Sequence, residues 1–273
     1  IKHISRTNNT SISTKFNTMV VLSMPAANDH QFTIIKNCKS PSTFFPCTTN
    51  NIPSIDLSKP DSKNQLVKAC EEFGFFKVVN HGHVPMEFIT KLESEAIKFF
   101  SSPMCQKEKL AGSLDPFGYG NKKIGPNGDV GWVEYILLST NSDFNYQKFA
   151  SILGVNPQDI RDAVSDYVSA MKRMACEILE MLAEGLKIHP KNVFSKLIMD
   201  EKSDSLFRLN HYPPCPDDEQ VQEFITGRKK LIGFGEHTDP QIISLLRSNN
   251  TCGLQISLVD GHWISVPPDP NSF

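Results

Sequence analysis

The sequence lacks the features that mark membrane-spanning, disulfide-bonded and nucleic-acid-binding proteins. In its 273 residues no apolar run approaches the roughly 18 residues that a membrane-spanning helix needs. The seven cysteines are scattered and odd in number, which argues against a disulfide framework and favours a reducing compartment. The formal net charge of −2 argues against binding to nucleic acid or anionic lipid. We therefore expect a cytoplasmic protein that binds neither nucleic acid nor membrane.

The first 50 residues carry no sustained hydrophobic period, so we expect residues 1–50 to form a mostly irregular N-terminal extension. The range 1–18 is polar and free of acidic residues, and the first methionine is Met19. We expect the natural chain to start at Met19. A transit peptide is the competing interpretation, since the stretch is rich in serine.

The next part, 51–150, alternates short strands and helices. A strand is expected over 52–57, and Asp61 or Ser62 is a suitable cap for a helix that ends before Gly74. Another strand is expected over 75–79, followed by a helix after Pro85. The range 111–131 is rich in Gly and Asn and is expected to be loop, with too little context for a phosphate-binding loop.

A long helix and its connection are expected over 151–204, and strands over 205–273. Asn156 and Pro157 form a good helix start, because Asn caps and Pro suits the first helical position. Near the C-terminus, Asp260-Gly261 predicts a hairpin turn. Helices followed by antiparallel strands predict a helical N-terminal region leading into a β-sandwich or barrel.

The segment most informative about chemistry contains His237 and Asp239, two residues apart. On an extended strand, residues i and i+2 point to the same face. One imidazole nitrogen and one carboxylate oxygen can then reach one metal ion, which is two-thirds of the two-His, one-carboxylate triad of iron(II) oxygenases. The pattern H-x-D is common by chance, and the alternative is a loop histidine beside a helix-capping aspartate.

The context of this pair resembles the plant 2-oxoglutarate- and iron(II)-dependent dioxygenases. Asn-His-Tyr-Pro-Pro at 210–214, followed by Gly-x-x-x-His-Thr-Asp at 233–239, is similar to that family's signature. The N-terminal segments 52–57, 69–76 and 79–82 match as well, so the resemblance covers about residues 50–273. Longer matches over 115–122, 131–135, 174–179 and 233–248 are most similar to the gibberellin 2-oxidase branch.

By that resemblance, the fold is α+β and mainly β: a helical region followed by a double-stranded β-helix, or jelly roll, incomplete at the C-terminus. His237 and Asp239 are the implied iron ligands and catalytic residues, and Tyr212 is the implied donor to the distal carboxylate of 2-oxoglutarate. The alternative for Tyr212 is a buried core tyrosine. His211 alternates to the opposite face and is expected to be structural.

The resemblance also implies an enzyme that uses Fe(II), 2-oxoglutarate and O2, with ascorbate as a supporting reductant. The substrate is a small molecule, a gibberellin hydroxylated at C2 and thereby inactivated, with succinate and CO2 as co-products. A gibberellin is an apolar-bodied carboxylic acid, so we expect a hydrophobic pocket with one basic or donor group. Lys122, Lys123 and Tyr135 are candidates for that group, and the alternative for the two lysines is a solvated loop face.

The sequence departs from the family after Asp239. The family's second iron-binding His and its Arg-x-Ser carboxylate grip do not occur, and His262 is too close in sequence to be the expected third ligand. We therefore expect a truncated member whose activity as a separate polypeptide is in doubt. Two alternatives stay open: another oxygenase of the family, acting on a flavonoid, an alkaloid or an aminocyclopropane-carboxylate, or a catalytically dead fragment.

Overall fold

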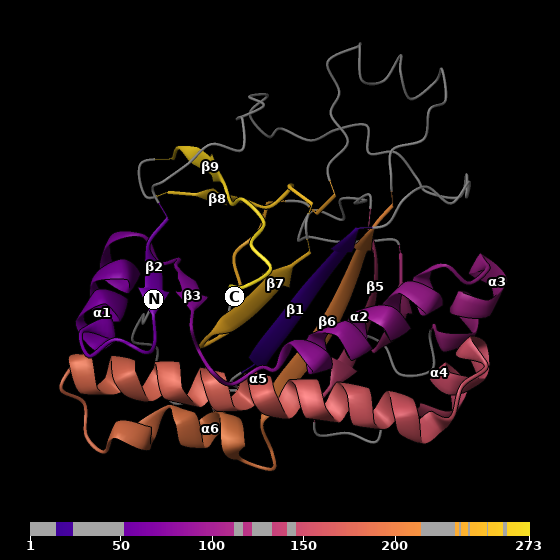
Figure 1. The fold of residues 1–273 in the computed structure, drawn as a ribbon, viewed down its shortest axis with the longest axis horizontal. Coiled ribbons are helices and arrows are strands. Elements are labelled where there is room, and N and C mark those ends of the chain that lie inside the picture. Colours follow the sequence, from indigo (N-terminus) through magenta and orange to yellow (C-terminus); the bar gives the residue numbers. More distant parts are fainter. Residues whose placement is uncertain are drawn as a thin grey trace, which may run out of the picture.

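A mixed β-sheet covered on one side by helices forms the centre of the molecule (Figure 1). The computed structural model describes the backbone course of 15–23 and, beyond it, residues 52–111, 117–121, 133–140, 146–213, 233–234, 236–239, 241–249, 251–258 and 261–273. Among these residues, no helix is both long and apolar enough to cross a membrane.

The main sheet has five strands in the order β4-β5-β6-β1-β7. Strands β4, β5 and β6 are antiparallel neighbours, whereas β1 runs parallel to both β6 and β7. The strands are β1 (Lys15–Ser23), β4 (Gly118–Gly120), β5 (Glu134–Ser139), β6 (Asp204–Tyr212) and β7 (Ser244–Ser248).

Two of these strands lie where the sequence predicted none. Strand β1 falls in the range 1–50, which was expected to be mostly irregular, and β4 falls in the expected loop 111–131. Both gain their hydrogen bonds from distant partners, β1 from β6 and β7 and β4 from β5. A local hydrophobic period carries no information on such long-range pairing. Gly118 and Gly120, two of the glycines in the range 111–131, therefore belong to a strand rather than to a loop.

The helical layer is built on one long helix, α5 (Pro157–Gly185). It begins as predicted, because the Asn156 side chain accepts a hydrogen bond from the Gln158 backbone N–H at 2.9 Å. The other helices are α1 (Ser62–Glu72), α2 (Met86–Phe100), α3 (Met104–Lys107), α4 (Tyr146–Leu153) and α6 (Ser195–Met199), with 3-10 turns η1 (Glu108–Leu110) and η2 (Lys191–Val193).

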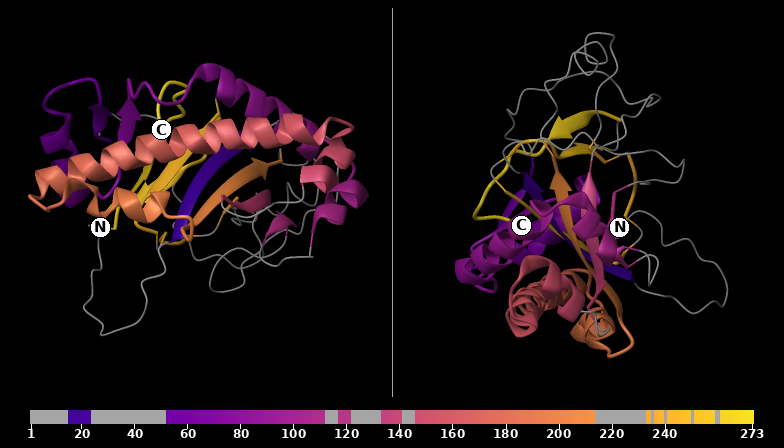
Figure 2. Two further views of the ribbon diagram at one scale, coloured as in Figure 1. Left: turned by 90° about the horizontal axis from the view of Figure 1, so that it is seen from below. Right: turned by 90° about the vertical axis from the view of Figure 1, so that its right-hand side faces the viewer.

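Helix α5 lies along one side of the sheet, with α6 beside it, while the hairpin of β8 (Gln255–Ser257) and β9 (Trp263–Ser265) lies on the other side (Figures 1 and 2). Met171 and Met174 of α5 are fully buried, as expected of core residues. Tyr167 of α5 contacts Phe207 of β6, with ring centroids 5.8 Å apart. Burial of each such side chain stabilises the fold by about 1.5–3 kcal/mol.

Strand β6 therefore has two different faces. Phe207, Leu209 and His211 point into the helical layer and are buried. Arg208, Asn210 and Tyr212 alternate to the opposite face, away from the helices. This second face carries the candidate site.

A smaller sheet brings the N- and C-terminal parts of the described chain together. Strand β2 (Ser54–Asp56) runs parallel to β3 (Lys77–Val79). The backbone of Phe273 forms two hydrogen bonds with Val78, at 2.8 and 3.1 Å. The predicted hairpin turn between β8 and β9 is present too, with Gly261 in the left-handed region at φ +86°.

Candidate metal centre

His237 and Asp239 lie together on the chain that connects β6 and β7. The distance from Nε2 of His237 to Oδ1 of Asp239 is 3.4 Å, and both side chains are partly exposed. The strand expected here is absent: residues 236–239 form no β-ladder, and a strand needs a hydrogen-bonded neighbour. The sequence therefore predicted the proximity of the two side chains correctly and the local backbone structure wrongly.

The surroundings of Asp239 favour its charged form. The hydrogen bond with His237 lowers the pKa of Asp239, and this outweighs the effect of burial, which raises it. A hydrogen bond with Ser244, at the start of β7, and the positive charge of Arg208 lower the pKa further. Asp239 is thus a carboxylate at neutral pH, the form that binds a metal ion.

The ring of Phe234 lies against the imidazole of His237, with centroids 4.3 Å apart and planes inclined by 43°. This contact restricts the orientation of the imidazole. Two donor atoms 3.4 Å apart can both reach one ion, because metal–ligand bonds of about 2.1 Å allow separations of up to about 4 Å. The pair therefore fits two ligand positions of an iron(II) ion.

The described residues contain no group of three or more His, Cys, Asp or Glu side chains arranged around one ion. His262 is among the described residues and does not join His237 and Asp239. This agrees with its sequence spacing, which is too short for the expected third ligand. Over the described part of the chain, the centre thus consists of one imidazole and one carboxylate.

Tyr212 lies at the end of β6, on the same face as Arg208. Burial raises the pKa of Tyr212 to about 12, so its hydroxyl stays protonated and can donate a hydrogen bond. Its ring packs closely on Gly233: a Cβ atom there would lie 2.7 Å from Cδ1 of Tyr212. The glycine of the Gly-x-x-x-His-Thr-Asp segment thus makes room for the tyrosine.

Arg208 is a residue of this site that was not predicted from the sequence. Its guanidinium lies over the ring of Tyr135, 4.0 Å from the centroid, and over Phe234 at 4.9 Å. A usable signal existed, since Arg208 stands four residues before Tyr212 on one strand and thus on the same face. Tyr135, a candidate from the sequence, is part of this arrangement. Lys122 and Lys123 lie outside the described residues.

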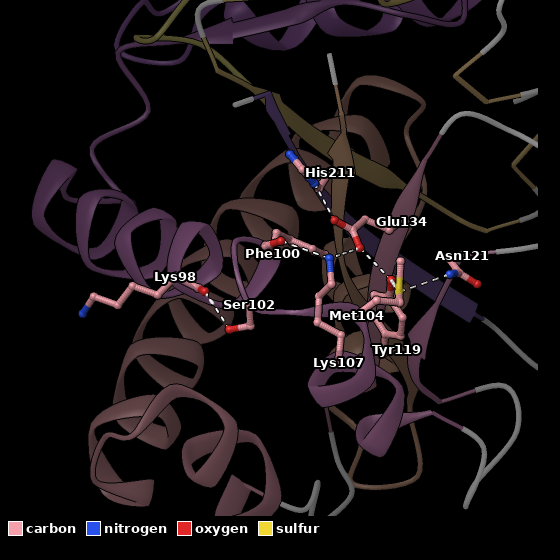
Figure 3. A network of polar contacts seen from close by, with 9 residues as sticks. All are labelled: Lys98, Phe100, Ser102, Met104, Lys107, Tyr119, Asn121, Glu134 and His211. Carbon is pink, nitrogen blue, oxygen red and sulfur yellow. Dashed lines mark hydrogen bonds and ion pairs between the residues drawn. The ribbon is translucent and has the colours of Figure 1, made fainter. Parts of the chain in front are cut away.

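A buried polar network occupies the opposite face of β5 and β6 (Figure 3). Glu134 binds the Nζ of Lys107 at 2.8 Å, the hydroxyl of Tyr119 at 2.6 Å and Nδ1 of His211 at 2.7 Å. The ring of Phe100 stacks on His211, with centroids 5.1 Å apart. His211 therefore has the structural place that its alternation with Tyr212 predicted, next to the site but facing away from it.

Two protein-family models match the chain. Residues 52–156 match the N-terminal model of non-haem dioxygenases in morphine synthesis, and residues 203–273 match the 2OG-Fe(II) oxygenase superfamily. The second range contains Tyr212, His237 and Asp239. It also contains Arg208.

Curated relatives are similar over most of the chain. Gibberellin 2-beta-dioxygenase 1 of Pisum sativum is 59% identical over 255 residues, which cover 93% of this chain and 72% of that protein. Gibberellin 2-beta-dioxygenase of Phaseolus coccineus is 54% identical, and the match covers 93% of this chain and 72% of that protein. Gibberellin 2-beta-dioxygenase 2 of Arabidopsis thaliana is 49% identical, and the match covers 93% of this chain and 71% of that protein.

Solved structures of oxygenases share the fold. The structure of JOX2 in complex with 2OG, Fe and JA has a TM-score of 0.63 at 25% identity, covering 90% of this chain and 69% of that one. The 2-oxoglutarate complex of dioxygenase for auxin oxidation 1 from Arabidopsis thaliana has a TM-score of 0.59 at 22% identity, with 81% and 77% covered. The predicted fold class, helices followed by a double-stranded β-helix, is confirmed.

Proposed function

Since this chain belongs to the gibberellin 2-beta-dioxygenases of the 2OG-Fe(II) oxygenase superfamily, we propose that it hydroxylates bioactive gibberellins at C2. The co-substrates are O2 and 2-oxoglutarate, and the co-products are succinate and CO2. The observation that carries the proposal is the His237–Asp239 pair, 3.4 Å apart, together with a protonated Tyr212 whose ring packs on Gly233 of the same segment.

His237 and Asp239 would hold the iron through Nε2 and a carboxylate oxygen. When bound, iron(II) supplies the oxidising chemistry that converts a C–H bond of the substrate into C–OH while 2-oxoglutarate loses CO2. The chain's contribution is to prepare these ligands. Asp239 is held as a carboxylate by His237 and Ser244, and Phe234 restricts the rotation of the imidazole.

Tyr212 would donate its hydroxyl hydrogen to the distal carboxylate of 2-oxoglutarate. A carboxylate offers only acceptors, so its partner must keep a proton at the working pH. The pKa of Tyr212, raised to about 12 by burial, meets this requirement. Gly233 supports the role, because only a residue without a side chain leaves the ring of Tyr212 in its place.

A product assay with several substrates tests the proposal. The purified chain is incubated with iron(II), ascorbate and 2-oxoglutarate, and with a bioactive gibberellin, a flavonoid or 1-aminocyclopropane-1-carboxylate. A parallel sample carries the sequence that follows the aligned region in the Pisum sativum relative, fused after Phe273. We expect a 2β-hydroxylated gibberellin and no product from the other two. If both samples oxidise another substrate and leave the gibberellin unchanged, the proposal is wrong.

A further inference from the structure

Arg208 is a partly buried cation that forms no ion pair among the described residues, although the charge of Asp239 is near enough to act on it. Among the described residues, no carboxylate lies within ion-pair distance of its guanidinium. Its Nη2 is shielded from solvent and forms no hydrogen bond. Burial lowers the pKa of Arg208, which reflects the free-energy cost of removing the charge from water. Such a charge is normally paired, and a missing partner points to an anionic ligand.

The guanidinium is held in one orientation by its neighbours. Its Nε donates a hydrogen bond to Oδ1 of Asn210 at 2.8 Å, which leaves Nδ2 of Asn210 as the second buried donor without an acceptor. The rings of Tyr135 and Phe234 lie 4.0 and 4.9 Å from the guanidinium carbon. The region thus offers donors without acceptors between aromatic faces, a suitable setting for a carboxylate on an apolar body.

The position of Arg208 relates it to the metal centre. Phe234 contacts both Arg208 and the imidazole of His237, and the charge of Arg208 acts on Asp239 and Tyr212. Arg208, Asn210 and Tyr212 share one face of β6, so a molecule bound to Arg208 lies on the face that carries Tyr212, and Phe234 connects this position to His237.

We propose that the guanidinium of Arg208, oriented by Asn210, binds the carboxylate of the organic substrate. The inference rests on the proposed function, in which the substrate is a gibberellin with a carboxylic acid. The aromatic flanks favour that substrate over 2-oxoglutarate, which is a small diacid with no apolar body to cover. Arg208 would fix the orientation of the substrate so that one C–H bond faces the metal centre.

Calorimetric titration with a gibberellin monocarboxylic acid and with its methyl ester tests the proposal. We expect the wild-type chain to bind the acid more tightly than the ester. Arg208→Gln should weaken binding of the acid by about 10- to 100-fold, the range of a charge-assisted hydrogen bond, and change binding of the ester by less than about twofold. Arg208→Lys keeps the charge and loses the planar fork, so its affinity for the acid should lie between that of the wild type and that of Arg208→Gln.

Two further variants test whether the effect is specific to Arg208 and to its lack of a carboxylate partner. Arg161→Gln removes an exposed arginine that lies 5.2 Å from the ring of Tyr146, and should leave both affinities unchanged. Asn210→Asp keeps the shape and supplies Arg208 with a carboxylate of the protein's own. Asn210→Asp should therefore reduce the preference for the acid over the ester, as Arg208→Gln does. The thermal unfolding midpoint of each variant shows whether the variant is folded.

The outcomes separate the proposals. If the wild-type chain binds the gibberellin and Arg208→Gln keeps the preference for the acid, the role of Arg208 is wrong and the proposed function stands. If Arg208→Gln weakens 2-oxoglutarate and leaves the acid-to-ester ratio unchanged, the arginine serves the co-substrate and the proposal is overturned. If the wild-type chain neither binds nor oxidises a gibberellin, the role of Arg208 and the proposed function are both wrong.

Discussion

Gly233 shows how a single missing side chain prepares the site. A Cβ atom at this position would lie 2.7 Å from the ring of Tyr212, closer than real contacts allow. Tyr212 cannot move without changing the position of its hydroxyl. Glycine is therefore needed at position 233 because the ring of Tyr212 occupies the space of a side chain, and not because the backbone there adopts a conformation that favours glycine.

We predict that Gly233→Ala weakens the binding of 2-oxoglutarate by about tenfold, because a displaced Tyr212 loses a hydrogen bond to a charged group. Gly253→Ala is the matched control, since no heavy atom lies within 4 Å of a Cβ placed there. Titration with 2-oxoglutarate in the presence of Mn(II) measures the effect. Equal affinities of the two variants would show that Tyr212 does not bind the co-substrate.

The residues that could be predicted from the sequence are those in short local patterns. His237 and Asp239 stand two residues apart, and Tyr212 lies within a motif of its own. For Arg208 the local sequence shows only that it lies on the same strand face as Tyr212, which does not assign it a role. Its role depends on Tyr135 and Phe234, which come from distant parts of the chain, and an arginine on an alternating strand is normally solvent-exposed.

At the scale of elements, the buried ion pair of Lys107 and Glu134 joins α3 to β5 beneath the site (Figure 3). Both side chains are at most 3% exposed. Lys107 also donates to the carbonyl of Phe100 at 3.0 Å, at the end of α2. One cation thus connects the ends of two helices to the strand that carries Tyr135.

We predict that Lys107→Met lowers the free energy of unfolding by about 3–5 kcal/mol, because it leaves the carboxylate of Glu134 buried without its cation. Lys98→Met removes the same kind of side chain from an exposed pair with Glu95, where Lys98 is 51% exposed, and should cost about 0–1 kcal/mol. Urea unfolding measures both values. Similar losses for the two variants would contradict the structural role of Lys107.

The same network predicts how stability depends on pH. Burial alone would raise the pKa of Glu134, but the hydrogen bond with His211 and the charge of Lys107 outweigh it and lower the pKa below 4.5. A lowered pKa contributes stability above the unfolded value, and this is lost as the pH falls through the folded value. Urea midpoints measured from about pH 6 down to about pH 3.5 should therefore fall more steeply in the wild type than in Glu134→Gln. Parallel curves would contradict the prediction.

Elements with a strong local signal were predictable. Helix α5 has a cap, a proline at its first position and a continuous buried stripe, and the hairpin of β8 and β9 has a turn dipeptide. Strands β1 and β4 have no such signal. They exist through pairing with β6, β7 and β5, which the local sequence does not encode.

At the scale of the whole molecule, α5 connects the parts of the fold. It contacts α1, α2, α4 and α6 along its length and supports the back of the sheet through Tyr167 and Phe207 (Figures 1 and 2). The site on the other face of β6 therefore depends on the helical layer. The predicted divisions near residues 50, 150 and 204 stay predictions.

We predict that Met171→Ala, at a fully buried position of α5, lowers the free energy of unfolding by about 2–5 kcal/mol. Met199→Ala removes the same side chain at a position that is 62% exposed, and should change stability by less than about 0.5 kcal/mol. Thermal and urea unfolding give both values. A small effect at Met171 would show that α5 is not part of the cooperative core.

The most direct test of the account is the ratio of succinate to 2β-hydroxylated gibberellin formed by the chain and by the chain extended as above, with His237→Ala and His262→Ala variants of each. We predict close to one succinate per hydroxylated product, loss of both products in His237→Ala, and retention of both in His262→Ala. Undiminished hydroxylation by His237→Ala, or its loss in His262→Ala alone, would contradict the assignment of the metal centre.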